Sequence, residues 1–335
     1  MNYPYFRFLV YCILITISGY VEAQDSTVRM APNLENINYP FPENYISLTL
    51  QGESLNMEYM DVHPEKPNGK VVMLLHGKNF NGAYWGQTAK DLAKNGFRVI
   101  IPDQIGFGKS AKPDHIQYSF QLLARNTKIM LDSLGIQQLY LLGHSMGGML
   151  AARFALMYPN VAEKLILENP IGLEDWKTVV PYISVDEWYQ SELNQTYESL
   201  KKYQLQFYYD NKWKAAYEPW LDMLAGPTKS IDYPRIAWNS ALLYDMIFTQ
   251  PVCYEFKYIQ APTLLIIGQR DRTALGKAQA PKEIQDSLGN YPKLGREAAK
   301  AIAHAQLIEL PGIGHLPHIE SYQEFITPLL EFLKN

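Results

Sequence analysis

Residues 139–148 read LYLLGHSMGG, an apolar run that leads directly into a serine with a glycine two positions away on either side. The apolar run predicts a strand buried on both faces, and the residues from Met146 onward have a helical period. A tight turn between such a strand and helix strains the backbone of Ser145 and exposes its Oγ, while Gly143 and Gly147 leave room for the neighbouring chain. We therefore predict that Ser145 is a nucleophile at the carboxyl edge of a sheet.

The same turn places Met146 at the first position of a helix, where the backbone N–H has no partner within the helix. Such an amide can donate a hydrogen bond to an oxygen that gains negative charge during attack on a carbonyl. Met146 is therefore predicted to supply one donor of an oxyanion hole.

Strand-like and helical patterns alternate along the rest of the chain. Apolar runs lie at 71–75, 99–101, 165–167, 264–267 and 307–310, and the segments 45–50 and 55–61 alternate apolar and polar residues like the strands of a hairpin. Helical periods lie at 84–94, 120–134, 146–157 and 322–333. This alternation predicts the α/β class, with a doubly wound, mostly parallel sheet of about eight strands and an antiparallel edge.

The alternation fails between residues 172 and 256, where no strand-like run occurs. This segment holds 18 of the chain's 43 Phe, Tyr and Trp residues. We expect an inserted helical cap at 172–256 and a core built from 45–171 and 257–335. The aromatic residues are expected to line an apolar or aromatic acyl site, although a small helical subdomain also needs them for its own core.

Composition and the first residues bear on partners and location. The chain has 335 residues, with 30 basic and 34 acidic side chains, so no overall positive field exists to attract nucleic acid. An apolar run near the start, followed by small residues, predicts a signal peptide at 1–23, and a polar, proline-interrupted arm follows at 24–44. The expectation is an exported protein, periplasmic or secreted, with no stable membrane anchor after cleavage; a retained anchor is the competing interpretation.

A second donor for the oxyanion is predicted in the loop after the apolar run 71–75. That loop reads His76-Gly77-Lys78-Asn79, and the backbone N–H of Lys78 can point at the same oxygen as the N–H of Met146. Asn79 and the next residue, Phe80, are expected to border the substrate entrance, and His76 is expected to be structural.

Two further residues follow predicted strands at the same sheet edge. Asp271 comes after the run 264–267, and His315 comes after the run 307–310 and directly after a glycine. Ser145, Asp271 and His315 thus occur in the chain order nucleophile, acid, histidine. If Asp271 were not the acid, Glu168, at the end of the run 165–167, would be the next candidate.

The remaining polar candidates are expected to be structural. His144 should point away from the nucleophile, and Asp103 is expected to fix a turn. His318 forms a His-x-x-His pair with His315, but no third ligand occurs at a suitable spacing, so no metal site is predicted.

With these motifs, residues 45 to 333 resemble the α/β-hydrolase superfamily, in its cap-bearing branch of esterases, epoxide hydrolase-like enzymes and proline iminopeptidases. The loop at 102–110 is similar to the one after that family's fourth strand. The resemblance implies that His315 takes the proton of Ser145 during attack and returns it to the leaving group, while Asp271 orients the imidazole. A serine at the elbow argues against epoxide hydrolases and dehalogenases of this family, which use an aspartate there.

The expected function is therefore an exported serine hydrolase that cleaves carboxylic esters of small to medium apolar or aromatic acids through an acyl-enzyme, without cofactors. Alternatives on the same three residues are an aminopeptidase similar to proline iminopeptidases and a hydrolase of carbon–carbon bonds. A non-catalytic binding protein of the same fold is a remote alternative. The segment 276–303 is expected either to add a second lid or to cover the sheet edge, and the oligomeric state stays open.

Overall fold

The computed structural model describes residues 30–335. The predicted signal peptide and the first residues of the predicted arm lie outside the described residues. The helices in the described part of the chain are α1 (Gly86–Lys94), α2 (Phe120–Ser133), α3 (Met146–Met157), α4 (Val185–Leu193), α5 (Tyr197–Phe207), α6 (Glu218–Ala225), α7 (Tyr233–Thr249), α8 (Lys282–Gln285), α9 (Tyr291–Ala301), α10 (Pro317–Glu320) and α11 (Tyr322–Lys334). None of them combines the length and apolar character needed to cross a bilayer.

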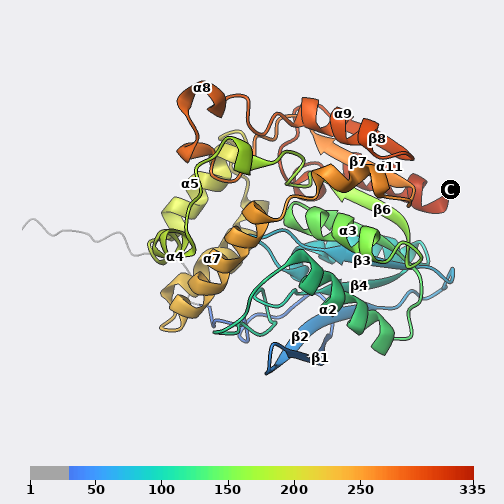
Figure 1. The fold of residues 1–335 in the computed structure, drawn as a ribbon. Helices are drawn as coiled ribbons and strands as arrows, with labels where there is room; N and C mark the ends of the chain where they lie inside the picture. The colour runs from blue at the N-terminus through green and yellow to red at the C-terminus, as the bar shows by residue number, and fades with distance from the viewer. Residues whose placement is uncertain (1–29) are drawn as a thin grey trace, which may run out of the picture.

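The strands form one sheet of eight, in the order β1-β2-β4-β3-β5-β6-β7-β8 (Figure 1). They are β1 (Glu43–Leu50), β2 (Glu53–Val62), β3 (Val71–Leu75), β4 (Arg98–Pro102), β5 (Leu139–His144), β6 (Ala162–Glu168), β7 (Thr263–Gly268) and β8 (Ala305–Leu310). Strand β2 pairs antiparallel with both β1 and β4, and all the other pairs are parallel. The predicted doubly wound, mostly parallel sheet with an antiparallel edge is confirmed.

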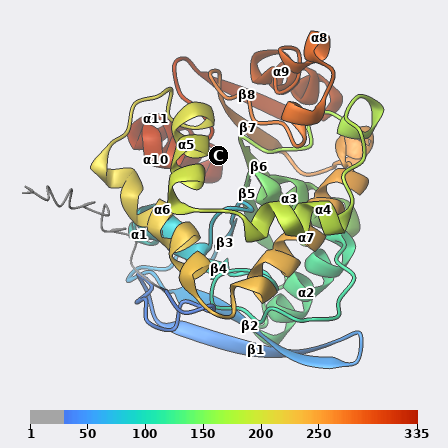
Figure 2. The ribbon, with the colours of Figure 1, turned by 90° about the vertical axis from the view of Figure 1, so that its left-hand side faces the viewer.

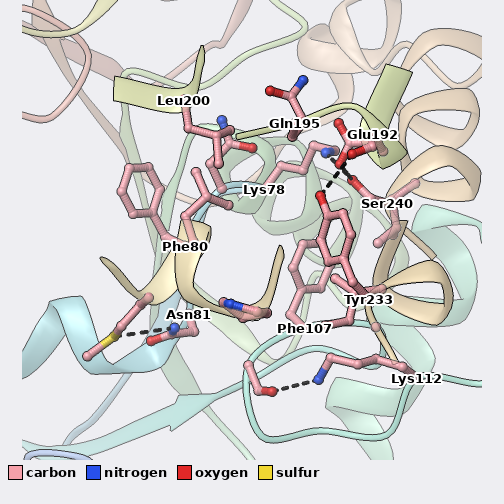
Figure 3. A pocket seen from close by; sticks show the side chains of 18 of the residues that line it. Lys78, Phe80, Asn81, Phe107, Lys112, Glu192, Gln195, Leu200, Tyr233 and Ser240 are labelled. Atoms are coloured by element: carbon pink, nitrogen blue, oxygen red, sulfur yellow. Dashed lines mark hydrogen bonds between the residues drawn. The ribbon is translucent and has the colours of Figure 1, made fainter. Parts of the chain in front are cut away.

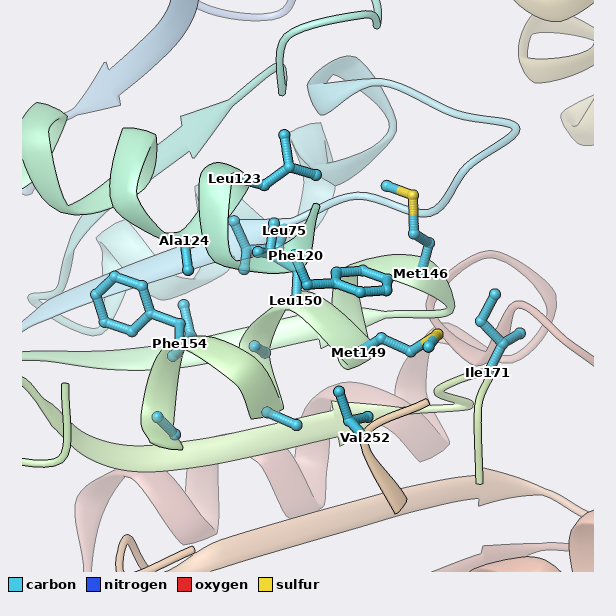
Figure 4. Packing of buried hydrophobic residues seen from close by; sticks show 14 of the residues in the cluster. Leu75, Phe120, Leu123, Ala124, Met146, Met149, Leu150, Phe154, Ile171 and Val252 are labelled. Atoms are coloured by element: carbon cyan, nitrogen blue, oxygen red, sulfur yellow. The ribbon is translucent and has the colours of Figure 1, made fainter. Parts of the chain in front are cut away.

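The core lies on both faces of the sheet because successive strand residues point to opposite sides. Met73 and Leu75 of β3 pack with α2 and α3 on one face, and Val72 and Leu74 pack with α1 and α11 on the other. Figure 4 shows the first face, where Phe120 and Phe154 lie among the aliphatic side chains of α2 and α3. Helices on both faces explain why the central strands read as continuous apolar runs.

The strand order creates a crevice at the carboxyl edge. Strand β3 lies between β4 and β5 in the sheet. The chain passes from β3 to its neighbour β4 on one side and then crosses to β5 on the other side of β3. The loops after β3 and β5 therefore diverge, and ligands of open α/β sheets bind at such a point. Lys78 follows β3 and Ser145 follows β5.

The insertion between β6 and β7 is helical and covers this end of the sheet. Helices α4, α5 and α7 lie on the left in Figure 1, and in Figure 2, which looks toward that end, α4 to α7 lie in front of the strands. The first two begin where the sequence supplies capping boxes, formed by Ser184 with Glu187 and by Thr196 with Ser199. The insertion thus stands over the loops that carry the predicted site.

The segment 276–303 was expected either to add a second lid or to cover the sheet edge, and its two parts lie in different places. Residues Gly276 to Gln279 line a cavity next to Ser145. Helix α9 instead packs against β7 and β8, where Gly295 lies against Ile267. The first part of the segment therefore borders the site, and the second part covers the sheet edge.

Candidate active site

Ser145 occupies a strained turn between β5 and α3. Its φ of 56° and ψ of −121° lie outside the regions that a residue with a side chain normally adopts. Hydrogen bonds hold the turn: the Ser145 N–H donates to Glu168 O, and its carbonyl accepts from the N–H groups of Gly148 and Ile171. A Cβ at Gly147 would lie 2.3 Å from Leu75 O, so only glycine fits beside the nucleophile.

The structure brings together the three residues that the sequence placed at neighbouring strand ends. His315 Nε2 lies 3.0 Å from Ser145 Oγ, and His315 Nδ1 lies 2.6 Å from Asp271 Oδ2. Asp271 and His315 are buried, and 6% of the Ser145 surface remains exposed. With Nδ1–H donated to the carboxylate, Nε2 is left as the acceptor for the serine proton.

Two further groups hold the Asp271 carboxylate in place. Asn169 Nδ2 donates to Oδ2 at 2.8 Å, and the backbone N–H of Thr273 donates to Oδ1 at 2.8 Å. Burial raises the pKa of Asp271, but the charge of His315 and the hydrogen bonds from His315 and Thr273 outweigh this effect, so the pKa falls below its ordinary value. Sequence reasoning missed Asn169, whose only signal is its position directly after β6.

Glu168, the other candidate acid, serves a different histidine. Its Oε1 accepts from both the backbone N–H and the Nδ1 of His318, each at 2.8 Å. The His318 ring stacks on Trp85 with a centroid distance of 4.3 Å. The two histidines of the His-x-x-His pair therefore face separate carboxylates rather than a shared ligand position.

His144 contributes more than the sequence predicted. Its Nε2 lies 2.8 Å from the carbonyl oxygen of His315, and its Nδ1 lies 3.0 Å from the Tyr84 hydroxyl, which accepts from the N–H of Gly77. Burial lowers the pKa of His144 well below its ordinary value, with the charges of His315 and His318 adding to the effect. A neutral His144 that accepts from Tyr84 and donates to His315 satisfies every partner, so it ties the loop after β3 to the backbone of His315.

The two proposed oxyanion donors belong to the turn of the nucleophile and to the loop after β3. Met146 is the first residue of α3, ahead of the first intrahelical N–H bond. The loop after β3 runs against the serine, since a Cβ at Gly77 would lie 3.0 Å from Ser145 Cβ. Lys78 and Ser145 line the same cavity.

This cavity has a volume of about 250 Å³, and seven of its twenty lining residues are aromatic. Most of its rings come from the insertion: Trp176, Trp188, Tyr203, Phe207, Tyr208 and Tyr244. Asn79 and Phe80, predicted at the substrate entrance, also line it. Asn79 Nδ2 donates to the Tyr208 hydroxyl at 3.1 Å, so the loop after β3 and the insertion meet over the nucleophile.

A second cavity of about 410 Å³ adjoins the first. The two share six lining residues, namely Lys78, Asn79, Phe80, Trp188, Tyr203 and Tyr244. A ligand too long for the smaller cavity would therefore extend past Lys78 into the larger one.

The family model described as alpha/beta hydrolase fold matches residues 70–322. A 2-hydroxy-6-oxononadienedioate/2-hydroxy-6-oxononatrienedioate hydrolase of Comamonas testosteroni is 27% identical over 281 residues, which cover 80% of this chain and 88% of that protein.

Two solved structures are also similar. The crystal structure of a probable hydrolytic enzyme from Pseudomonas aeruginosa PAO1 is 48% identical, with a TM-score of 0.91, and covers 92% of this chain and 99% of its own. The enol-lactonase from Burkholderia xenovorans LB400 shares the fold at 20% identity, with a TM-score of 0.66 over 87% of this chain and all of its own.

Proposed function

Because the chain belongs to the alpha/beta hydrolase family, we propose that it is a serine hydrolase that cleaves carboxylic esters of small to medium apolar or aromatic acids. The observation that carries the proposal is the 3.0 Å contact between Ser145 Oγ and His315 Nε2 at the wall of an aromatic cavity. Family membership and relatives named as hydrolases make the chain an enzyme, so the non-catalytic alternative is not retained.

The chemistry follows from the positions of the polar atoms. Ser145 Oγ attacks the ester carbonyl while His315 Nε2 takes its proton, and the carbonyl oxygen accepts from the N–H groups of Lys78 and Met146. His315 then protonates the departing alkoxide as the C–O bond breaks, which leaves an acyl-enzyme on Ser145. Water repeats the attack with His315 as the base, and the acid leaves as Ser145 regains its proton.

Asp271 keeps the imidazole in the productive tautomer throughout this cycle. Its hydrogen bond fixes the proton on Nδ1 and stabilises the imidazolium that forms at each attack. Asn169 and Thr273 share the task, because they orient the carboxylate toward His315.

A hydrolase of carbon–carbon bonds is the second candidate. The relative from Comamonas testosteroni is named as a hydrolase of 2-hydroxy-6-oxo dienedioates and trienedioates. A 2-hydroxy-6-oxo-6-phenylhexa-2,4-dienoate hydrolase of Burkholderia cepacia is 39% identical over 108 residues, which cover 31% of this chain and 38% of that protein. An aminopeptidase is less well supported, since an amine needs a carboxylate partner. Glu168 pairs with His318, and Glu174 accepts from the N–H of Gly289 and from Trp176.

Labelling tests the nucleophile directly. A fluorophosphonate probe followed by peptide mass spectrometry should place one adduct on Ser145, and Ser145→Ala should take up none. An adduct on another residue, or active protein that resists labelling, would sink the assignment. Comparison of kcat/KM for nitrophenyl esters, aminoacyl amides and vinylogous diketo acids then separates the ester hydrolase from the two alternatives.

Export is a separate proposal that rests on the leader-like sequence at 1–23. Expression in a Gram-negative host with its natural N-terminus should give mature protein in the periplasm or medium. N-terminal sequencing of that protein should begin at Gln24. Full-length protein retained in the cytosol would contradict export, and full-length protein in the membrane fraction would favour the anchor.

A further inference from the structure

The charged groups around the smaller cavity are all of one sign. Lys78, Arg272 and Lys277 line the cavity that contains Ser145, and no carboxylate lines it within the part of the chain that the structure describes. Two of these cations are committed to backbone carbonyls: Arg272 Nη1 donates to Gln269 O and Asp271 O, and Lys277 Nζ donates to Leu288 O. The cavity beside the nucleophile therefore favours an anionic ligand over a cationic one.

Lys78 differs from the other two cations in its position and partners. Its Nζ donates to Ser240 Oγ of α7 at 2.7 Å and lies 3.3 Å from the centroid of the Tyr244 ring. The Ser240 hydroxyl in turn donates to Glu192 Oε2 of α4 at 2.6 Å. The Glu192 carboxylate is thus one hydroxyl away from the ammonium.

This geometry leaves the ammonium with unused hydrogen-bonding capacity. An ammonium has three N–H donors, and Ser240 takes one of them. Figure 3 shows the Lys78 side chain beside Ser240 and Glu192 in the wall of the larger cavity. Lys78 lines both cavities, so a ligand that extends from Ser145 into the larger cavity passes its ammonium.

We propose that the Lys78 ammonium is a substrate-binding group that recognises a carboxylate on the ester, which makes carboxylate-bearing esters of apolar or aromatic acids the preferred substrates. The inference rests on the proposed serine hydrolase function and adds a specificity group to it. The backbone N–H of Lys78 serves the oxyanion while its side chain holds the distant anion, so one residue aligns both ends of the substrate. Ser240 and Glu192 hold the ammonium in position before the substrate arrives.

Burial supports this role because it makes the unpaired ammonium costly. It lowers the pKa of Lys78 to about 8, and the charge of Glu192 only partly opposes the effect. An arriving carboxylate restores the favourable surroundings of the cation, and a charge-assisted hydrogen bond in such a site changes binding by about tenfold or more.

The test compares charged and neutral esters of matched shape. In the first set, each 4-nitrophenyl half-ester of a dicarboxylic acid is compared with the diester in which the free carboxyl group is methylated. In the second set, 3-carboxy-4-nitrophenyl butyrate is compared with 4-nitrophenyl butyrate. The first set places the carboxylate on the acid and the second places it on the alcohol. In each enzyme the measured quantity is the ratio of kcat/KM for the anionic ester to kcat/KM for the neutral ester. For at least one set, this ratio should be about tenfold or more lower in Lys78→Met than in wild type. It should persist in Lys78→Arg, which keeps the charge.

A control separates a direct contact from a general field. Lys277→Met removes a cation from the same cavity and should change the ratio far less. A ratio that stays within threefold of wild type in Lys78→Met for both sets overturns the proposal. Equal losses in Lys78→Met and Lys277→Met overturn it as well.

Binding separates failure of this inference from failure of the proposed function. Calorimetry measures the affinity for a half-ester and for its methylated diester without turnover in two proteins, Ser145→Ala and the double variant that carries both Ser145→Ala and Lys78→Met. Anion-dependent binding that Lys78→Met abolishes supports the inference even if wild type hydrolyses neither ester, and that lack of hydrolysis counts against the ester hydrolase alone. Hydrolysis of both esters with no dependence on Lys78 overturns the inference alone.

Discussion

The ring of Tyr208 stacks on the imidazole of His315, with a centroid distance of 4.8 Å and an interplanar angle of 23°. Tyr208 directly follows α5 of the insertion, whereas His315 follows β8 of the sheet. The insertion therefore contacts the histidine that moves the proton, in addition to covering the cavity. A flat ring over the imidazole limits both its rotation and its access to water.

Removal of this ring should slow the reaction. Tyr208→Ala uncovers His315 and frees it to turn from Ser145, and misalignment of this kind costs up to about 100-fold in rate. Tyr208→Phe keeps the stack but loses the hydrogen bond from Asn79, so it should retain more activity than the alanine variant. Steady-state kcat on a nitrophenyl ester measures both. Equal activity in the alanine and phenylalanine variants would show that the stack has no role.

Asp271→Asn should preserve the fold but remove most of the activity. An amide whose oxygen accepts from the Thr273 N–H presents its NH₂ to His315 and to the Asn169 amide that donates to Oδ2 in wild type, so the Asn169 contact is lost and the imidazole proton moves to Nε2. The serine proton then has no acceptor, and comparable replacements in serine hydrolases lower kcat about 10⁴-fold. A kcat within tenfold of wild type, in protein with unchanged circular dichroism, would rule out Asp271 as the orienting acid.

Much of the fold could be predicted because the central strands are buried on both faces. The predicted ends of the elements are wrong where a strand reaches the rim of the sheet or a helix begins with a different turn. Strand β6 begins at Ala162, three residues before the apolar run, since Glu163 lies at the rim and pairs with Lys70. The helix expected at 84–94 begins as a 3₁₀ turn at Gly82–Trp85, because the Asn81 side chain caps the N–H of Ala83.

The site divides in the same way between local and distant signals. Ser145, Asp271 and His315 each follow a strand at the same edge, so topology alone predicts that they approach one another. The contacts of His144 with the His315 carbonyl and of Tyr208 with the His315 ring join residues more than 100 positions apart. No periodicity or motif encodes such pairs, because they depend on how the insertion and the last loop settle on the sheet.

The Tyr84 hydroxyl should stabilise the loop after β3. It accepts from the Gly77 N–H at 2.9 Å and lies 3.0 Å from His144 Nδ1, and all three groups are buried. Tyr84→Phe keeps the ring but leaves a buried donor and a buried acceptor without partners, which costs about 1–3 kcal/mol of folding free energy. Urea unfolding measures this loss, with Tyr59→Phe at a half-buried position of β2 as the control. Equal midpoints for the two variants would exclude the bridge through Tyr84.

The preference for anionic over neutral esters should decrease as the pH rises. Burial lowers the pKa of Lys78 to about 8, so the side chain is charged below that pH and loses its proton as the pH rises through it. Glu192 of α4 and Tyr244 of α7 lie beside its ammonium, and Tyr203 of α5 lines both cavities with it. Burial raises the pKa of Tyr203 to about 12 and that of Tyr244 well above its ordinary value. Neither tyrosine therefore becomes charged in the range of interest.

The ratio of kcat/KM for anionic over neutral ester should accordingly be high at pH 6.5 and fall with a midpoint near pH 8. Both esters use the same Ser145 and His315, so the pH dependence of the shared chemistry cancels from the ratio, and the substrate carboxylate stays ionised because its ordinary pKa is about 4. Lys78→Arg should abolish the fall, since a guanidinium keeps its charge over this range. A wild-type ratio that stays constant up to pH 9.5 would mean that the charge of Lys78 does not set the preference.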